Sequence, residues 1–247
     1  MVIAGMIGLD EQYIAPMRAC TETFIDTTST EEPLKAAIQI YTMFAELLEE
    51  RRHRPRDDMM SALISAEIDG ERLSDEELLG FCLLLVLGGN DTTASLIGSG
   101  TVLLLNHPDQ LELLQDDSTL WPGAIEEMLR IESPTQALPR STTRDIELHG
   151  VHIPADSRVL LVWGSANHDE REFPDPERFD IQRKAQRHTA FGHGVHYCMG
   201  THLARLEARI AFTEWFARFP GCRLAGEAVR TTSSWARAFD SIPLQLG

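Results

Sequence analysis

Residues 191–200 have the sequence FGHGVHYCMG, in which three glycines surround one cysteine, Cys198. Glycine allows positive φ angles and close approach of the backbone to a flat ligand. We expect a helix to begin directly after this loop, at about Met199, and free N–H groups at a helix start favour a thiolate. Such a loop is costly for folding and useful for holding a metal, so it predicts a chemical role for Cys198.

The other three cysteines are far apart in the sequence, at Cys20, Cys82 and Cys222. No CxxC pair is present, and a zinc site would need ligands clustered at short spacings. A disulfide framework is also not expected in a chain of this size with so few cysteines. We therefore expect reduced thiols, with Cys82 and Cys222 buried as small apolar side chains, and leave Cys20 unassigned.

The composition is that of a soluble globular protein, with 247 residues, 43% of them apolar, and a formal net charge of −16. We expect one domain over residues 1–247. Phosphates repel an acidic chain, so neither nucleic acid nor an anionic membrane is an expected partner. The apolar run 81–87 is too short to span a bilayer, and residues 1–9 lack the basic start of a signal peptide. A cytoplasmic location follows as the expectation.

The first half of the sequence predicts helices. Apolar residues recur at helical spacing over 34–51, and the segment ends in a basic cluster that suits a helix C-terminus. Asp57 or Asp58 is expected to cap a short helix that runs to Ile68, and Asp69-Gly70 predicts a turn.

A long helix is predicted over residues 74–106, with a capping box formed by Ser74 and Glu77. Its middle contains the segment 88–93, GGNDTT. Two adjacent glycines cost roughly 2 kcal/mol of helix propensity relative to alanine, so a bulge or kink is expected there. By itself, the segment is explained as well by a tolerated flaw in the helix, or by close packing of another helix, as by a functional role.

The second half mixes a few helices with short strands. Pro122 is expected to start a helix through Ile131, and another helix is expected over 199–219. Alternating apolar and polar residues over 145–162 and 233–246 predict short antiparallel strands. The predicted fold class is therefore mainly α with small antiparallel β-sheets.

The loop at 191–200 resembles the haem-binding loop of cytochrome P450 monooxygenases in their soluble bacterial form. The matching residues are Phe191, Gly192, Gly194, Cys198 and Gly200. This resemblance implies that Cys198 is the proximal ligand of the iron of haem b, and a thiolate ligand promotes O–O cleavage.

Two histidines of the same loop receive different interpretations. His196 matches a position that often donates to a haem propionate in this family. His193 is at a variable position, where a structural role or a contact at the rim is expected.

Glu127 and Arg130 resemble the Glu-x-x-Arg signature of the same family. The spacing places both side chains on one face of the 122–131 helix, although such pairs are most often exposed and contribute little. The family's third partner is an arginine before a phenylalanine, which Arg178 supplies. The resemblance implies a structural network of these three residues that holds the Cys198 loop.

Arg140 matches the arginine that usually pairs with a haem propionate, a task that suits the bidentate geometry of the guanidinium. Without the other motifs, a solvated arginine on a strand would explain it equally well. Gly88 and Gly89 resemble the oxygen-binding groove of the family's long distal helix. Asp91 and Thr92 match the acid–alcohol pair that delivers protons there.

The implied function is haem-thiolate monooxygenation, in which one oxygen atom of O2 enters a small apolar organic substrate. Electrons would come from a ferredoxin-type or flavin redox partner. Several basic residues flank the Cys198 loop and are expected to form a docking face for an acidic ferredoxin, or else to be ordinary solvated charges: Arg183, Lys184, Arg187, Arg205 and Arg209.

The resemblance covers residues 2–246 and departs from the family at its start, where a further block of helices normally precedes residues 1–9. The fold is therefore expected to be P450-like and truncated at the N-terminus, with apolar surface left uncovered. This keeps two alternatives open, an inactive remnant that binds haem weakly or not at all and a peroxide-using haem enzyme. A cysteine hydrolase using Cys198 and His196 is disfavoured, because the two residues lie too close together in a tight loop.

Overall fold

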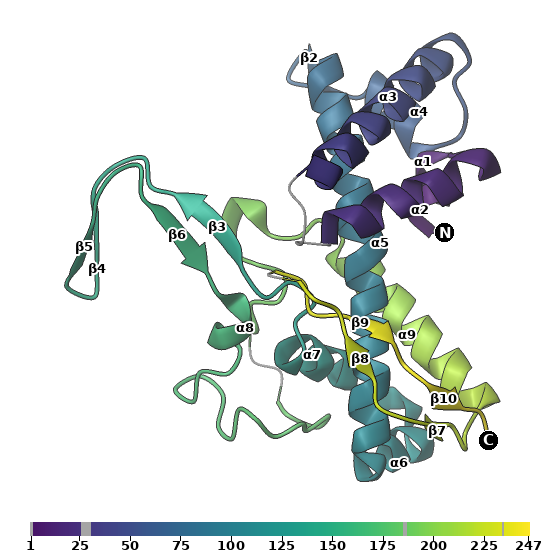
Figure 1. Ribbon diagram of the computed structural model, residues 1–247, viewed down its shortest axis with the longest axis vertical. Coiled ribbons are helices and arrows are strands. Elements are labelled where there is room, and N and C mark those ends of the chain that lie inside the picture. The colour runs from purple at the N-terminus through teal and green to yellow at the C-terminus, as the bar shows by residue number, and fades with distance from the viewer. Residues whose placement is uncertain (1, 26–30, 185–186, 234) are drawn as a thin grey trace. The chain divides into compact units, whose positions relative to one another are not determined.

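The structure is a computed structural model that describes residues 2–25, 31–184, 187–233 and 235–247. The chain divides into two compact units, Met1–Thr92 and Thr93–Gly247. Figure 1 labels most of the elements of both units. The elements of the first unit are α1 (Val2–Ile7), α2 (Glu11–Ile25), α3 (Glu31–His53), α4 (Met59–Ser65), β1 (Glu67–Ile68), β2 (Glu71–Arg72) and the first part of α5 (Asp75–Asn106).

Helix α3 contains the whole segment 34–51 that the sequence predicts to be helical. Its acidic first turn and basic last turn both complement the helix dipole, and it buries Ile40, Phe44 and Leu47. The helix also leaves Leu34 and Ile38 exposed, at 64% and 58% of their surface.

Helix α4 begins as predicted, because the carboxylate of Asp58 accepts a hydrogen bond from the N–H of Ser61 at 2.8 Å. The predicted end at Ile68 is wrong. The helix ends at Ser65, and Glu67–Ile68 instead pairs with Glu71–Arg72 as an antiparallel hairpin. The turn residues Asp69 and Gly70 have φ angles of 54° and 85°, so the turn signal of this segment outweighed its helix propensity.

Helix α5 starts with the predicted capping box. The N–H of Ser74 donates to the carboxylate of Glu77 at 2.8 Å, and the N–H of Glu77 donates to the hydroxyl of Ser74 at 3.3 Å. The helix continues in α form through residues 88–93, so the predicted bulge is not formed. It is also long and apolar enough to cross a membrane by length and composition, a test that core helices of soluble proteins pass as well. The apolar run 81–87 seen in the sequence is therefore only part of a longer apolar helix.

The second unit contains the remaining helices and short strands. They are the rest of α5, α6 (Pro108–Asp116), η1 (Ser118–Leu120), α7 (Trp121–Ile131), β3 (Leu138–Ser141), β4 (Ile146–Leu148), β5 (Val151–Ile153), β6 (Arg158–Leu161), α8 (Trp163–Ala166), η2 (Gly194–His196), α9 (Thr201–Arg218), β7 (Arg223–Leu224), β8 (Val229–Arg230), β9 (Phe239–Ser241) and β10 (Leu244–Gln245).

The strands of this unit pair in twos, all antiparallel: β3 with β6, β4 with β5, β7 with β10, and β8 with β9. In Figure 1 the β4–β5 hairpin projects beyond the end of the β3–β6 pair. The predicted fold class, mainly α with small antiparallel sheets, is confirmed.

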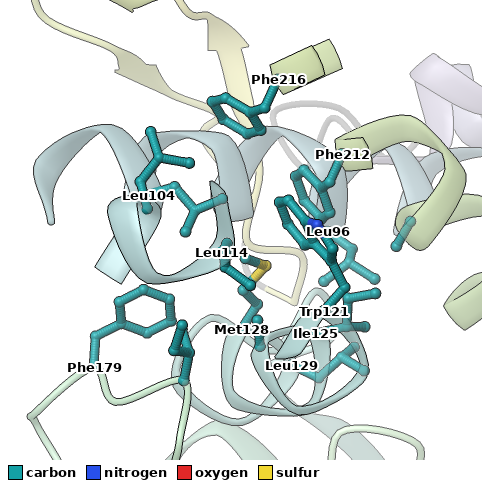
Figure 2. Close-up of a cluster of buried hydrophobic side chains, with 14 residues drawn as sticks. Leu96, Leu104, Leu114, Trp121, Ile125, Met128, Leu129, Phe179, Phe212 and Phe216 are labelled. Carbon is teal, nitrogen blue, oxygen red and sulfur yellow. The ribbon is translucent and has the colours of Figure 1, made fainter. Parts of the chain in front are cut away.

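The core of the second unit joins α7 and α9 to the second half of α5 (Figure 2). The rings of Trp121 and Phe212 stack with centroids 5.6 Å apart and an interplanar angle of 5°. A Cβ atom at Gly100 would lie 2.5 Å from the ring of Phe212, so only glycine permits this close approach of α5 and α9. Helix α9 is thereby fixed directly after the Cys198 loop.

Candidate functional site

The Cys198 loop is closed by its own backbone. Gly192 and Gly194 both have φ angles of +71°, which side chains rarely adopt. The N–H of Cys198 donates to the carbonyl of Phe191 at 2.9 Å, and the N–H of Tyr197 donates to the carbonyl of Gly194 at 3.0 Å. Helix α9 follows at Thr201, two residues later than the sequence predicts. The glycines thus form a tight turn that presents Cys198 just before a helix.

Cys198 is the one exposed cysteine among the four, all of which the structure describes. Its neighbours Val195, Tyr197 and Met199 are 97%, 52% and 59% exposed. A soft sulfur donor framed by exposed apolar side chains suits a flat apolar group that carries a metal. The chemistry of this loop therefore fits a haem.

The other cysteines are buried, as predicted for two of them. Burial raises the pKa of the Cys82 thiol to about 11 and also raises the pKa of the Cys20 thiol. Cys20 donates to the side-chain oxygen of Gln39 at 3.2 Å and lines a cavity of about 700 Å³ between α2 and α3. That cavity contains none of the predicted site residues.

The predicted propionate partners lie on two short elements of the second unit. Arg140 is on β3 opposite Val159, is half-buried, and donates to the carbonyl of Pro139 at 3.0 Å. His196 ends the short helix η2 and is exposed, as is His193 before it. Their role toward a haem stays a prediction.

Glu127 and Arg130 form a buried ion pair on α7. Both carboxylate oxygens accept hydrogen bonds from Arg130, each at 2.8 Å, and the two side chains are only 3% and 2% exposed. Arg130 also donates to the carbonyls of Asn167 and Pro176 at 2.8 Å. Because it is buried, this pair differs from the exposed pairs that contribute little. Through Arg130 it also ties α7 to the segment before the Cys198 loop.

The prediction that the side chain of Arg178 completes this network is wrong. That side chain is 66% exposed and lies 3.8 Å from Asp180, and only its backbone carbonyl accepts hydrogen bonds from the network. The second guanidinium that binds Glu127, besides that of Arg130, is the guanidinium of Arg183, at 3.1 Å. The two arginines are five positions apart, and no local pattern distinguishes which of them the chain turns inward.

The predicted docking face is correspondingly reduced. Arg183 is 14% exposed and also donates to three backbone carbonyls, so it is a structural residue. Arg205 is bound to Glu126 through two hydrogen bonds. Lys184, Arg187 and Arg209 are exposed.

The predicted proton-relay pair lies on α5 in the first unit. Burial and the nearby charge of Glu22 raise the pKa of Asp91 to about 6, with Arg18 opposing them in part. The hydroxyl of Thr92 donates to the carbonyl of Gly88. A Cβ atom at Gly89 would lie 2.5 Å from the side chain of Ile3, whereas one at Gly88 would meet nothing. Close helix packing thus explains Gly89, and Gly88 has no packing requirement of this kind.

Comparison with known families decides the family. A model of the cytochrome P450 family matches residues 22–222. This chain belongs to the cytochrome P450 family.

Among curated P450 relatives, the chain is 41% identical to 6-deoxyerythronolide B hydroxylase of Saccharopolyspora erythraea, over 99% of this chain and 62% of that protein. It is 39% identical to cytochrome P450 monooxygenase PikC of Streptomyces venezuelae, over 99% of this chain and 60% of that protein. The chain therefore spans less than two thirds of the length of these relatives.

Solved P450 structures have the same fold as this chain. The Bacillus subtilis cytochrome P450 PksS of bacillaene polyketide synthase superposes with a TM-score of 0.95 at 34% identity, over 100% of this chain and 65% of that one. CYP109E1 of Bacillus megaterium, solved in complex with testosterone, gives 0.90 at 36% identity, over 99% and 68% of the two chains.

Proposed function

We propose that this P450 chain binds haem b through Cys198. We propose further that it acts as a monooxygenase, which inserts one oxygen atom of O2 into a small apolar organic substrate. The observation that supports this best is the exposed thiol of Cys198 in a glycine-shaped loop with an apolar rim. The printed names of the two curated relatives, a hydroxylase and a monooxygenase, support the reaction class.

The residues proposed to hold the haem lie in the Cys198 loop and on β3. Cys198 would ligate the iron, and Phe191, Gly192 and Gly200 would shape the backbone around that ligand. Arg140 and His196 bind the propionates, since a guanidinium and an imidazole N–H are suitable donors to carboxylates. Thiolate-ligated haem supplies the oxygen activation, because thiolate electron density promotes O–O cleavage.

Asp91 and Thr92 are proposed to hold and pass protons for the same reaction. With a pKa of about 6, Asp91 is part protonated just below neutral pH, which suits a group that both takes up and releases a proton. The Thr92 hydroxyl keeps its oxygen lone pairs available while it donates to Gly88. Gly88 leaves open space on the helix beside this pair, whereas Ile3 fills the space at Gly89.

Electrons are proposed to come from a ferredoxin-type or flavin partner in the cytoplasm. The exposed cations Lys184, Arg187 and Arg209 are the part of the predicted basic face that stays available for an acidic partner. Neither nucleic acid nor a membrane is a proposed partner of this acidic chain.

The test is the spectrum of the reduced, carbon monoxide-bound chain after reconstitution with haem. Thiolate ligation should give a strongly red-shifted Soret band, which Cys198→Ala should lose and Cys222→Ala should keep. Identical spectra for the wild type and Cys198→Ala would refute the proposal and favour an inactive remnant. If the wild-type chain shows the thiolate spectrum and its activity with peroxide is unaffected by Asp91→Asn, the peroxide-using alternative is favoured.

A further inference from the structure

Glu126 and Glu127 are adjacent on α7 but bind different parts of the second unit. Successive residues of an α-helix point about 100° apart. Glu127 binds Arg130, Arg183 and the N–H of Asp180. Glu126 instead accepts two hydrogen bonds from Arg205 of α9, at 2.6 and 2.8 Å, and one from His188 at 3.1 Å.

The imidazole of His188 has a defined arrangement between Glu126 and the start of the Cys198 loop. The N–H of Ala190 donates to Nδ1 of His188 at 3.3 Å. Nδ1 is therefore the acceptor, and Nε2 carries the hydrogen that is donated to Glu126. The His188 side chain is only 6% exposed, so this contact anchors the chain just before Phe191.

Arg205 extends the same cluster onto the loop itself. Its guanidinium carbon lies 4.6 Å from the centroid of the Phe191 ring, a cation–π distance. The Phe191 ring also meets the ring of Tyr197 edge-on, with centroids 6.4 Å apart. The carbonyl of Phe191 accepts the hydrogen bond from the N–H of Cys198. Arg205 thus holds Phe191, the residue whose carbonyl is hydrogen-bonded to the N–H of Cys198.

Glu126 holds the arginine in turn. Although burial acts to raise its pKa, the hydrogen bonds from Arg205 and His188 keep the pKa of Glu126 at about 2. The carboxylate of Glu126 is therefore ionised at every pH at which the protein would work. A bidentate carboxylate fixes both the position and the plane of a guanidinium, and the plane is what stacking on Phe191 requires.

We propose that Glu126 is a positioning residue for Cys198, which acts through Arg205 and Phe191 to fix the direction of the thiol. Only the identity of the group that the thiol binds, a haem, rests on the proposed function. Glu127 and Glu126 then form two separate clamps, one on the segment 176–183 and one on the segment 188–198.

The two clamps can be separated by amide hydrogen exchange in the haem-free chain. Glu126→Gln and Arg205→Lys should speed exchange at the amides of Tyr197 and Cys198 roughly tenfold, because the closed loop opens more often. Exchange at Asp180 should stay within about twofold. Arg183→Lys, which weakens the other clamp, should give the reverse pattern. Arg209→Lys, one turn further along α9, should change neither.

The haem-reconstituted chain supplies a second readout. At equal haem content, Glu126→Gln and Arg205→Lys should lower the fraction of the carbon monoxide complex that shows the red-shifted thiolate band. Unchanged exchange at Tyr197 and Cys198 in both variants would overturn the positioning role, whatever the spectrum. If the wild-type chain shows no thiolate band, the proposed function fails, and the exchange pattern alone decides the role of Glu126. Arg205→Lys keeps the test open if Glu126→Gln does not fold.

Discussion

Arg51 and Asp58 form a buried ion pair inside the first unit. The Nε of Arg51 donates to the carboxylate of Asp58 at 2.7 Å, and the two side chains are 1% and 4% exposed. Arg51 also donates to the carbonyl of Gly8 at 2.6 Å. The pair therefore connects α3 to the N-cap of α4 and to the end of α1.

Loss of Asp58 should leave the buried Arg51 charge with only one carboxylate partner, the more exposed Glu50 at 3.0 Å. Asp58→Ala is expected to lower the free energy of unfolding by about 3–5 kcal/mol, because the buried Arg51 charge loses its buried partner and α4 loses its N-cap. Arg52→Ala, which removes two more exposed ion pairs, with Glu49 and Asp75, should cost about 1 kcal/mol or less. Urea unfolding followed by circular dichroism measures both changes, and equal losses would contradict the importance of burial.

The adjacent glycines of α5 should respond in opposite ways to alanine. Gly88→Ala meets no neighbour and should stabilise the helix by about 0.5–1 kcal/mol. Gly89→Ala would place its Cβ 2.5 Å from Ile3 and should be destabilising. Thermal unfolding of the two variants compares them directly. A gain in stability for both would show that α1 does not pack against Gly89.

Asp91 should make stability depend on pH in a defined window. Its pKa is raised from 3.8 to about 6, so the folded chain binds more protons between these values, and stability falls as the pH rises through them. Asp91→Asn removes this penalty and should add about 1–2 kcal/mol at pH 8 and almost nothing at pH 4. Urea unfolding at the two pH values tests this, and an equal gain at both would argue against a raised pKa.

Cysteine labelling should distinguish Cys198 from the other thiols. In the native haem-free chain, iodoacetamide should modify Cys198 and leave Cys20, Cys82 and Cys222 largely unmodified, because these three are buried. Peptide mass spectrometry measures the site, and Cys198→Ser should leave the native chain almost unlabelled. Early labelling of Cys82 would contradict the burial of its side chain.

Arg183 and Arg178 should differ sharply in their effect on stability. Arg183→Ala leaves Glu127 with one guanidinium partner fewer and frees three carbonyls, so a loss of about 2–4 kcal/mol is expected. Arg178→Ala removes an exposed side chain and should cost less than about 0.5 kcal/mol. Denaturant unfolding of both variants checks the assignment, and the reverse order would restore Arg178 to the network.

Short-range patterns in the sequence were sufficient for much of the fold. The Ser74–Glu77 capping box, the Asp58 cap and the Asp69-Gly70 turn all form as predicted, because each depends on residues within four positions of one another. The glycine loop around Cys198 belongs to the same class, since its hydrogen bonds join residues at most seven positions apart.

Only the tertiary structure decided which side chains meet across long separations. Arg183 rather than Arg178 binds Glu127, and Arg205 binds Glu126 from 79 residues away. Such pairs depend on how distant segments fold back on α7, and an arginine has the same local signature whether it is buried or solvated. Residue types and spacings therefore determined the family and the thiol loop, whereas long-range packing determined the contacts that hold the loop in place.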